Sequence, residues 1–278
     1  QLLLNKGKTA AYENPGYPGL RSILYQSDCE LTAVDVDKDG LNPSKLPLGI
    51  DVVFTTPSHH APTAVTMPMN RRHALLKRAS DQNMIIIEDD YEFEMSFLKA
   101  PSPALKSLDT EGRVIYIGSF SKSLFPGLRL GYLVASEPLI QQARALRSTV
   151  LRHPPGHMQR TTANFLALGH YDALVRRMKD AYFERRQVMA KALREHGLTI
   201  AGSASFGGSS FWMRAPDHIN TRNLASKLKE EGVLIEPGAP FFEGRDGPRN
   251  HYRLAYSSID SEAITKGISI ISEAIKNS

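Results

Sequence analysis

Short apolar runs alternate with longer amphipathic stretches in the first half of this 278-residue chain, and no other feature of the sequence constrains the fold as strongly. The apolar runs are rich in Val and Ile and end in polar residues, as buried strands do. Helical patterns lie among them, in NRRHALLKRASDQ and EPLIQQARALRSTV. Strands that alternate with helices predict an α/β layer fold with a mainly parallel sheet over residues 8–150. The runs assigned to strands are DVVFTTP, NMIIIEDD, RVIYIGSF and LRLGYLVAS.

The second half of the chain has a different pattern. Two long helical patterns, around residues 157–169 and 171–196, are followed by shorter runs of mixed polarity. These runs are LTIAG, SSFWMRA, VLIEPGAPFF and HYRLAYSS, with further helices expected at 221–231 and 261–276. The pattern predicts a second, smaller α+β domain. We therefore expect a large domain over residues 1–184, with its N-terminal part missing, and a small domain over residues 185–278.

Composition and charge disfavour several classes of protein. The net charge of +5 comes from scattered basic residues, which favours an ordinary solvated surface over a nucleic-acid interface. The chain has no run of about 18 apolar residues, the length that crosses a membrane, and no signal peptide. Its single cysteine, Cys29, cannot form an internal disulfide. We expect a cytoplasmic protein without membrane contact and without a metal site.

Polar clusters follow three of the expected strands. TTPSHHAPT follows the first, EDDYE the second and SFSKS the third. In an open α/β sheet, ligands bind in the crevice beyond the carboxyl ends of the strands. The three polar clusters together therefore predict one ligand site built from the ends of several strands.

The third cluster contains Lys122 and, seven positions later, Arg129, within GSFSKSLFPGLRLGY. A lysine held near a crevice can form a Schiff base with an aldehyde cofactor. Pyridoxal phosphate then requires an acid at its ring nitrogen, a donor to its phenolic oxygen, a flat side chain over the ring and a cup for the phosphate. The chain offers Asp89, Tyr91 and Tyr17 for the first three roles, and Ser119, Ser121 and Arg129 for the cup.

Four motifs, in this order, resemble those of fold-type I pyridoxal-phosphate enzymes of the aspartate aminotransferase class. They are ENPGYPG, TPSHHAPT, EDDYEFE and SFSKSLFPGLRLGY, and the resemblance runs from Tyr12 to the C-terminus. It implies a mainly parallel sheet of the seven-stranded type with helices on both faces, plus a smaller C-terminal α+β domain. It also implies a homodimer with sites at the subunit interface.

The resemblance assigns roles to individual residues. Lys122 takes the place of the Schiff-base lysine, and Asp89, thirty-three residues earlier, that of the partner of the pyridine nitrogen. Arg253 in HYRLAYSS takes the place of the arginine that grips a substrate carboxylate with two hydrogen bonds. The other expected cofactor contacts are Tyr91 at the phenolic oxygen, Tyr17 on the ring, Ser119, Ser121 and Arg129 at the phosphate, and His60.

Most of these residues could instead have a structural role. Asp89 and Asp90 could form an N-cap pair, although a cofactor contact is favoured for Asp89 and a structural role for Asp90. Tyr17 could pack a turn, Arg253 could be an edge-strand surface charge, and His59 or His60 could form hydrogen bonds within a turn. Four aromatic residues could line a pocket around Arg253 or belong to the small-domain core, which is favoured. They are Phe206, Trp212, Phe241 and Phe242.

Two function classes fit such a site, a working aminotransferase and a ligand sensor. Working aminotransferases of this class carry an Asn that donates to the phenolic oxygen, whereas Ala61 stands at the aligned position here. PSHHAPT and EDDYEFE are more similar to the aminotransferase-like effector domains of MocR-type regulators of the GntR family. Those domains bind pyridoxal phosphate and sense an amino acid, an amine or the vitamer itself. We therefore predict a MocR-type effector-sensing domain, with an active class I or II aminotransferase as the alternative.

The start of the sequence is consistent with the effector domain of a regulator that has an upstream DNA-binding domain. It is equally consistent with any other truncated chain. QLLLNKGKTAAYENPG lacks an initiator Met and opens as the last turn of an apolar helix would. In MocR-type regulators a winged helix-turn-helix precedes the effector domain, so we expect DNA contact only through an upstream domain absent from this chain. The family's first phosphate-cup turn would also lie upstream of Gln1.

Overall fold

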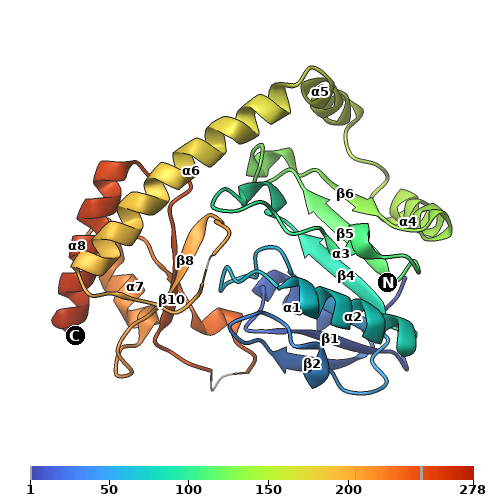
Figure 1. Cartoon of the computed structure of the whole chain (residues 1–278), viewed down its shortest axis with the longest axis horizontal. Helices are drawn as coiled ribbons and strands as arrows, with labels where there is room; N and C mark the ends of the chain where they lie inside the picture. Colours follow the sequence, from blue (N-terminus) through green and yellow to red (C-terminus); the bar gives the residue numbers. More distant parts are fainter. Residues whose placement is uncertain (1, 204, 245–246) are drawn as a thin grey trace.

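The computed structural model describes residues 2–203, 205–244 and 247–278. These residues form two sheets joined by one long helix, α6 (His170–Glu195), as Figure 1 shows. The larger sheet has the strand order β2-β1-β3-β4-β5-β6, and the smaller has the order β7-β8-β10-β9. The α/β fold predicted from the alternating runs is confirmed.

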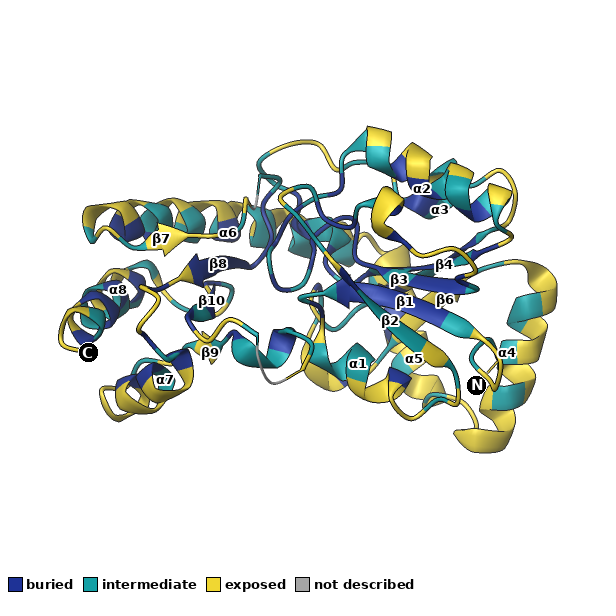
Figure 2. Ribbon diagram, turned by 90° about the horizontal axis from the view of Figure 1, so that it is seen from below, coloured by how far each residue is buried: buried dark blue, intermediate teal, exposed yellow. Residues whose placement is uncertain are grey.

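Five strands of the larger sheet are parallel, and the sixth, β6, runs antiparallel to β5. The strands are β1 (Thr9–Asn14), β2 (Glu30–Asp35), β3 (Val52–Thr55), β4 (Ile85–Asp90), β5 (Val114–Ser119) and β6 (Gly131–Val134). Helices lie on both sides of this sheet, as expected (Figure 2). On one side are α2 (Met69–Asp81) and α3 (Leu105–Leu108), and on the other α1 (Pro18–Leu24), α4 (Glu137–Val150) and α5 (Gly156–Ala167).

The first two strands are not predicted by the sequence pattern, and neither are the short helices α1 and α3. The segments TAAYEN and ELTAVD mix small and polar residues instead of forming an apolar run. β1 is nevertheless largely buried, because it pairs with β2 on one side and β3 on the other. The described part of the sheet has six strands, one fewer than the seven-stranded type that the resemblance implies.

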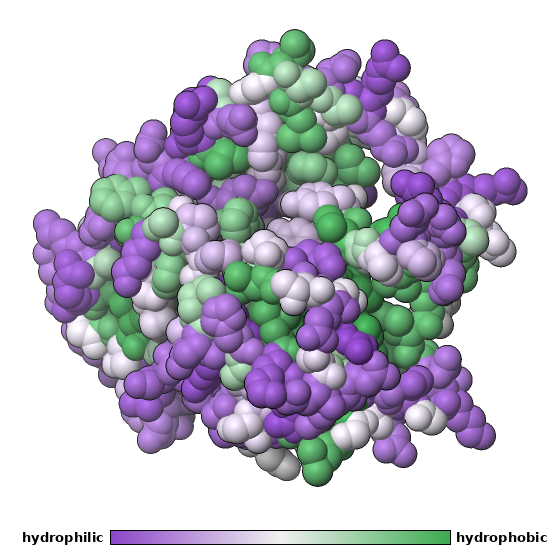
Figure 3. Space-filling view, turned by 45° about the vertical axis from the view of Figure 1, so that its right-hand side comes forward, coloured by the Kyte–Doolittle hydropathy of each residue, from purple (hydrophilic) through white to green (hydrophobic). Residues whose placement is uncertain are grey.

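β6 and α4 form an exposed side of the larger sheet. All four residues of β6 are exposed, including Tyr132, Leu133 and Val134, and α4 buries none of its residues. Figure 3 turns this side of the molecule forward and shows hydrophobic surface between polar side chains. Within the described ranges, no helix combines the length and the apolar character that a membrane span needs.

The smaller sheet belongs to an α+β unit, as the second half of the sequence predicts. Its elements are β7 (Thr199–Ile200), β8 (Ser210–Arg214), α7 (Thr221–Glu230), β9 (Glu236–Pro237), β10 (His251–Ala255) and α8 (Ser261–Lys276). The C-terminal half of α6 buries Tyr182, Met189 and Leu193, which share one helix face. They meet Phe211 and Tyr252 of the sheet in one apolar core. Because α6 crosses residue 185 without a break, the domain boundary there stays a prediction.

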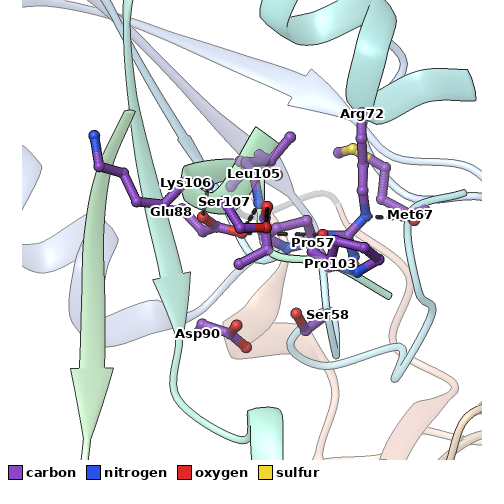
Figure 4. Close-up of polar contacts among 12 residues, drawn as sticks. Pro57, Ser58, Met67, Arg72, Glu88, Asp90, Pro103, Leu105, Lys106 and Ser107 are labelled. Atoms are coloured by element: carbon purple, nitrogen blue, oxygen red, sulfur yellow. Dashed lines mark hydrogen bonds and ion pairs between the residues drawn. The ribbon is translucent and has the colours of Figure 1, made fainter. Parts of the chain in front are cut away.

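A buried arginine, Arg72, holds the loops around the carboxyl ends of β3 and β4. It shares one face of α2 with Leu75 and Ala79, and its side chain is completely buried against the sheet. A buried guanidinium is tolerated only when its donors are satisfied. Figure 4 shows its three carbonyl acceptors, Pro57 at 2.8 Å, Met67 at 3.0 Å and Pro103 at 3.0 Å.

The charge of Arg72 is balanced by Glu88 on β4, which is also completely buried. The Arg72 Nη1 and Glu88 Oε1 atoms are 4.0 Å apart. The carboxylate also accepts hydrogen bonds from the backbone N–H groups of Leu105 at 2.7 Å and Lys106 at 2.8 Å, at the start of α3. Removing one partner of such a buried pair leaves the other charge uncompensated.

We therefore expect Arg72→Ala to lower the free energy of unfolding by about 3–5 kcal/mol, measured by urea denaturation. Arg71→Ala is the matched control, because Arg71 forms a partly exposed pair with Asp37, at 2.6 Å. That variant should lose about 1 kcal/mol. If Arg72→Ala does not fold, Arg72→Lys still tests the interpretation, since it keeps the charge and loses the fork of donors. Equal losses for Arg72 and Arg71 variants would contradict it.

Candidate functional site

The three polar clusters identified in the sequence meet at one edge of the larger sheet. β3, β4 and β5 are neighbours and run parallel, so their carboxyl ends point the same way. The segments that follow them are therefore side by side, although they are far apart in the sequence. Such an edge is where ligands bind in open α/β sheets.

Asp89 and Tyr17 line one narrow cavity at this edge. Asp89 projects from β4, and Tyr17 is the residue directly before α1. The tyrosine is 56% exposed and lines the edge of this cavity. The structure thus places these two predicted cofactor residues together. The cavity is lined by Tyr12, Glu13, Gly16, Tyr17, Leu20, Arg21, Thr55, Thr56 and Asp89.

The Asp89 carboxylate has no hydrogen-bond donor among the described residues. Burial raises its pKa to about 6, and the charge of Glu13 contributes to the same shift. Glu13, by contrast, accepts hydrogen bonds from Thr55 Oγ1 at 2.7 Å and from Thr56 N at 3.0 Å and Oγ1 at 2.7 Å. An unpartnered carboxylate beside a second negative charge suits a cationic N–H group, such as a protonated pyridine nitrogen. The residues present therefore fit the predicted cofactor ring.

His60 lies behind Glu13 and does not line this cavity. Its side chain is fully buried, with Nδ1 2.7 Å from Thr63 Oγ1 and Nε2 3.5 Å from Glu13 Oε2. The geometry matches a hydrogen-bonding turn role for His60, and the cofactor contact stays a prediction. His59 is also buried, with Nε2 3.2 Å from Ser96 Oγ, and burial lowers its pKa to about 4.

Lys122 and the three predicted phosphate residues lie in the β5–β6 connection. Ser119 ends β5 and pairs with Gly131 of β6, so the segment between them projects beyond the sheet edge. Ser119 Oγ accepts a hydrogen bond from the backbone N–H of Ser121 at 3.1 Å. Arg129 adopts a left-handed backbone conformation with φ of 51°. Lys122 and Arg129 are both exposed, and their side chains form no ion pair within the described residues.

Two residues not predicted from the sequence, Ser123 and Tyr171, hold the β5–β6 connection that carries Lys122 in place. Ser123, directly after Lys122, is buried, and its Oγ lies 2.9 Å from the hydroxyl of Tyr171 at the start of α6. That hydroxyl also donates to Glu94 at 2.5 Å. Phe120 packs edge-on against the Tyr171 ring, with 6.0 Å between ring centroids. A serine and a tyrosine carry no motif, so only their tertiary contacts reveal this role.

Tyr91 and Arg253 come together from the two sheets. Burial raises the pKa of the Tyr91 hydroxyl well above its ordinary value, and the nearby Glu92 adds to the shift. The positive charge of Arg253 on β10 acts on the same tyrosine in the opposite direction. Tyr91 is therefore a neutral hydroxyl that can donate a hydrogen bond. The sequence pattern does not predict that Tyr91 and Arg253 lie near each other.

Glu92 is a further member of the site that the sequence pattern does not single out. Its carboxylate is buried, accepts hydrogen bonds from Ser209, and has its pKa raised by burial. The positive charges of Arg253 and Lys122 lower the pKa of Glu92 and so act against the effect of burial.

Backbone contacts fix the two sheets relative to each other at this point. The N–H of Gly208 donates to the carbonyl of Met95 at 3.0 Å, and the N–H of Phe97 donates to Phe206 O at 3.0 Å. Gly207 has φ of 131°, and a Cβ there would lie 2.4 Å from the Met95 carbonyl oxygen. Only glycine allows so close an approach. The segment after Tyr91 is thereby bound to the connection that leads into β8, the strand that pairs with β10 and Arg253.

Two of the four aromatic residues considered for a pocket are buried, and two are half-buried. Trp212 and Phe241 are buried, with ring centroids 5.7 Å apart, which fits the favoured core role. Phe242 is half-buried beside Trp212, at 6.2 Å. The Lys99 ammonium lies over the ring of Phe206, with 5.4 Å between Nζ and the ring centroid.

Asp90 lies on the opposite side of β4 from Asp89, because successive side chains of a strand alternate. Its carboxylate is buried and accepts a hydrogen bond from Tyr116 at 3.3 Å. Figure 4 shows Asp90 and Ser58 below Glu88 and the carbonyl groups that bind Arg72. Burial raises the pKa of Asp90 to about 7, and the charge of Glu88 adds to the effect. These contacts fit the structural role expected for Asp90.

The chain belongs to the aminotransferase class I and II family, which its sequence matches over residues 1–271. It is 59% identical, over 276 residues, to the HTH-type transcriptional regulator TauR of Rhodobacter capsulatus, a match that covers 99% of this chain and 57% of TauR. It is 31% identical to the probable rhizopine catabolism regulatory protein MocR of Rhizobium meliloti, a match that covers 99% of this chain and 56% of MocR. The chain thus spans little more than half the length of these two regulators.

A solved aminotransferase structure has the same fold. LysN, the α-aminoadipate aminotransferase of Thermus thermophilus, complexed with N-(5'-phosphopyridoxyl)-L-leucine, matches with a TM-score of 0.90 and 28% sequence identity. The match covers 99% of this chain and 73% of LysN. The fold-type I class and the likeness to both regulators and aminotransferases are confirmed.

Asp90→Asn should change how stability depends on pH. The pKa of Asp90 is about 7 in the native protein, against an ordinary value of 3.8. The native state therefore binds more protons than the unfolded chain between these values, and the stability from this group is lost as the pH rises from about 4 to about 7. The free energy of unfolding of the wild type should fall by about 2–4 kcal/mol relative to Asp90→Asn over this interval, measured by urea denaturation.

The exposed Asp81 provides the control, because its ion pair with Lys77 lies at the surface. Asp81→Asn should give a pH profile parallel to that of the wild type. Parallel profiles for Asp90→Asn and the wild type would show that the Asp90 carboxylate is not a buried proton-binding group.

Proposed function

We propose that this chain is the effector-sensing part of a MocR-type transcriptional regulator, and that it senses an amino acid, an amine or a pyridoxal vitamer through bound pyridoxal phosphate. One observation carries the proposal. The unpartnered Asp89 carboxylate and the exposed Lys122 amine lie at the same edge of a parallel sheet. The 59% identity to TauR, whose name describes a transcriptional regulator, supports the regulatory part.

Pyridoxal phosphate, when bound, supplies an aldehyde that reacts with primary amines and a ring that withdraws electrons. Lys122 would supply the amine that meets this aldehyde. Asp89 would hold a proton at the ring nitrogen, because its half-buried carboxylate has no other donor among the described residues. Tyr91, neutral because its pKa is raised, would donate a hydrogen bond to the phenolic oxygen. Tyr17 would cover one face of the ring.

The phosphate and the ligand acid group would be held by two different arginines. Ser119, Ser121 and Arg129 lie in the segment beyond β5 and supply hydroxyls, backbone N–H groups and a guanidinium for the phosphate. Arg253 approaches from the other sheet, beside Tyr91, where an acid group on the ligand would lie. A guanidinium suits a carboxylate because its donors form a planar fork.

A sensor is favoured over an enzyme by the residue at position 61. Ala61 has no side-chain donor, whereas working aminotransferases place an Asn at the aligned position. Loss of one buried donor weakens the hold on the phenolic oxygen by about 1–3 kcal/mol. The alternative is an active class I or II aminotransferase, which the likeness to LysN supports.

The partners of the whole protein are part of the proposal. Because both regulators are about twice as long as the region that matches this chain, DNA contact is assigned to a helix-turn-helix outside it. The exposed apolar residues of β6 support a homodimer, since a second copy would remove them from water. A cytoplasmic location follows from a regulatory role.

Lys122→Ala should abolish the visible absorbance that pyridoxal phosphate acquires when it is attached to a lysine. The reason is that no other lysine lies in the segment between β5 and β6. The measurement is an absorbance spectrum of the purified full-length protein after addition of pyridoxal phosphate. Lys99→Ala, an exposed lysine beside Phe206, is the control and should keep the band. An unchanged spectrum for Lys122→Ala would exclude Lys122 as the attachment site.

Ala61→Asn should raise the rate of amino-group transfer by about tenfold, because it restores a donor worth about 1–3 kcal/mol. The measurement is single-turnover conversion of the bound cofactor to its amine form by an amino acid, followed by absorbance. Ala64→Asn serves as the control for a change elsewhere in the same loop. Rapid turnover of the wild type, with no gain from Ala61→Asn, would support the aminotransferase instead of the sensor.

A further inference from the structure

The arginine assigned to the ligand acid group already binds an acid of its own chain. Arg253 Nη1 lies 3.0 Å from Glu236 Oε2, and Arg253 Nε donates to Ser210 Oγ at 2.9 Å. Two of the three guanidinium nitrogens are thus engaged. The Glu236 carboxylate occupies one of the positions that a ligand carboxylate would take.

Strand register places Glu236 there. In the smaller sheet, Arg253 of β10 pairs with Trp212 of β8 on one side and with Glu236 of β9 on the other. Directly paired residues of neighbouring antiparallel strands project from the same face of a sheet. Glu236 therefore projects from the face that carries Arg253, and the ion pair follows from the backbone pairing.

The two partners differ in how far they reach into water. The Arg253 side chain is 21% exposed, whereas the Glu236 side chain is 52% exposed. The carboxylate can rotate into solvent without losing hydration, but the guanidinium stays against the protein and beside Tyr91. Because the Glu236 partner is exposed, the ion pair contributes little to stability and a competing anion can displace the carboxylate.

We propose that the Glu236 carboxylate competes with the acid group of the ligand for Arg253. Through this competition, Glu236 makes the site distinguish amines that carry a carboxylate from amines that do not. This inference rests on the proposed function, in which Arg253 faces the ligand. An amine that carries a carboxylate displaces Glu236 and takes over Arg253. An amine without an acid group leaves the Arg253–Glu236 ion pair intact and contacts a pair whose charges cancel. The site therefore accepts both kinds of ligand, but only a ligand with a carboxylate breaks the ion pair.

The first test compares two ligands that differ by one carboxylate, L-alanine and ethylamine. Each is titrated into the full-length protein carrying pyridoxal phosphate, with cofactor absorbance as the readout. Glu236→Gln keeps the shape of the side chain and removes its charge, so it should tighten the apparent Kd of L-alanine by about three- to fivefold. The apparent Kd of ethylamine should change by less than about twofold. Glu230→Gln, at the exposed end of α7, should change neither.

An equal change for both ligands, or none for L-alanine, would overturn the inference. A second measurement separates this failure from failure of the proposed function. Arginines of the full-length protein are labelled with phenylglyoxal, without any amine ligand, and Arg253 is followed by peptide mass spectrometry with acetate as the competing anion. Glu236→Gln should label Arg253 several-fold faster and let acetate protect it at lower concentration. Identical labelling and protection in Glu236→Gln and the wild type would overturn the inference, even if neither ligand changes the absorbance.

Discussion

The parallel pairing of β3, β4 and β5 is the constraint on which the rest of the structure depends. Because these neighbouring strands run in one direction, the polar segments after them end at one edge of the sheet. That edge brings together Asp89 and Lys122, which no local feature of the chain would join. The buried Arg72 and Glu88 pair stabilises the surrounding loops, and it is tolerated because backbone groups satisfy both side chains.

Alternation along β4 then gives three consecutive carboxylates different environments. Glu88 and Asp90 project into the layer beneath α2, where one is paired with an arginine and the other binds a proton up to about pH 7. Asp89 projects from the other face into the narrow cavity beside Glu13 and has no donor among the described residues. Three carboxylates of one strand thus supply two structural anchors and the acid proposed for the cofactor, because the pleat of the strand decides which side each group faces.

The smaller sheet completes the site by bringing Arg253 to Tyr91. The close backbone contact at Gly207 holds the two sheets together there, and the register of β10 with β9 adds Glu236 to the arginine. In the proposed function, the site therefore combines residues for the cofactor on the larger sheet with residues for the ligand acid group on the small antiparallel sheet. The Arg253–Glu236 ion pair belongs to the second group, where a ligand that differs only in its acid group would act.

Local pattern alone determined most of the elements of this protein. The apolar runs from residue 51 onward became strands, and the expected helices agree with the structure to within two residues, because burial and periodicity are local properties. The motif around Lys122 and Asp89 likewise identified the cofactor chemistry. Only the tertiary structure revealed β1 and β2, whose small and polar residues are buried by pairing with neighbouring strands. Only the tertiary structure showed the contacts of Glu92, Tyr171 and Glu236. Those side chains are ordinary in the sequence, and they acquire partners because strand register and packing bring distant segments into contact.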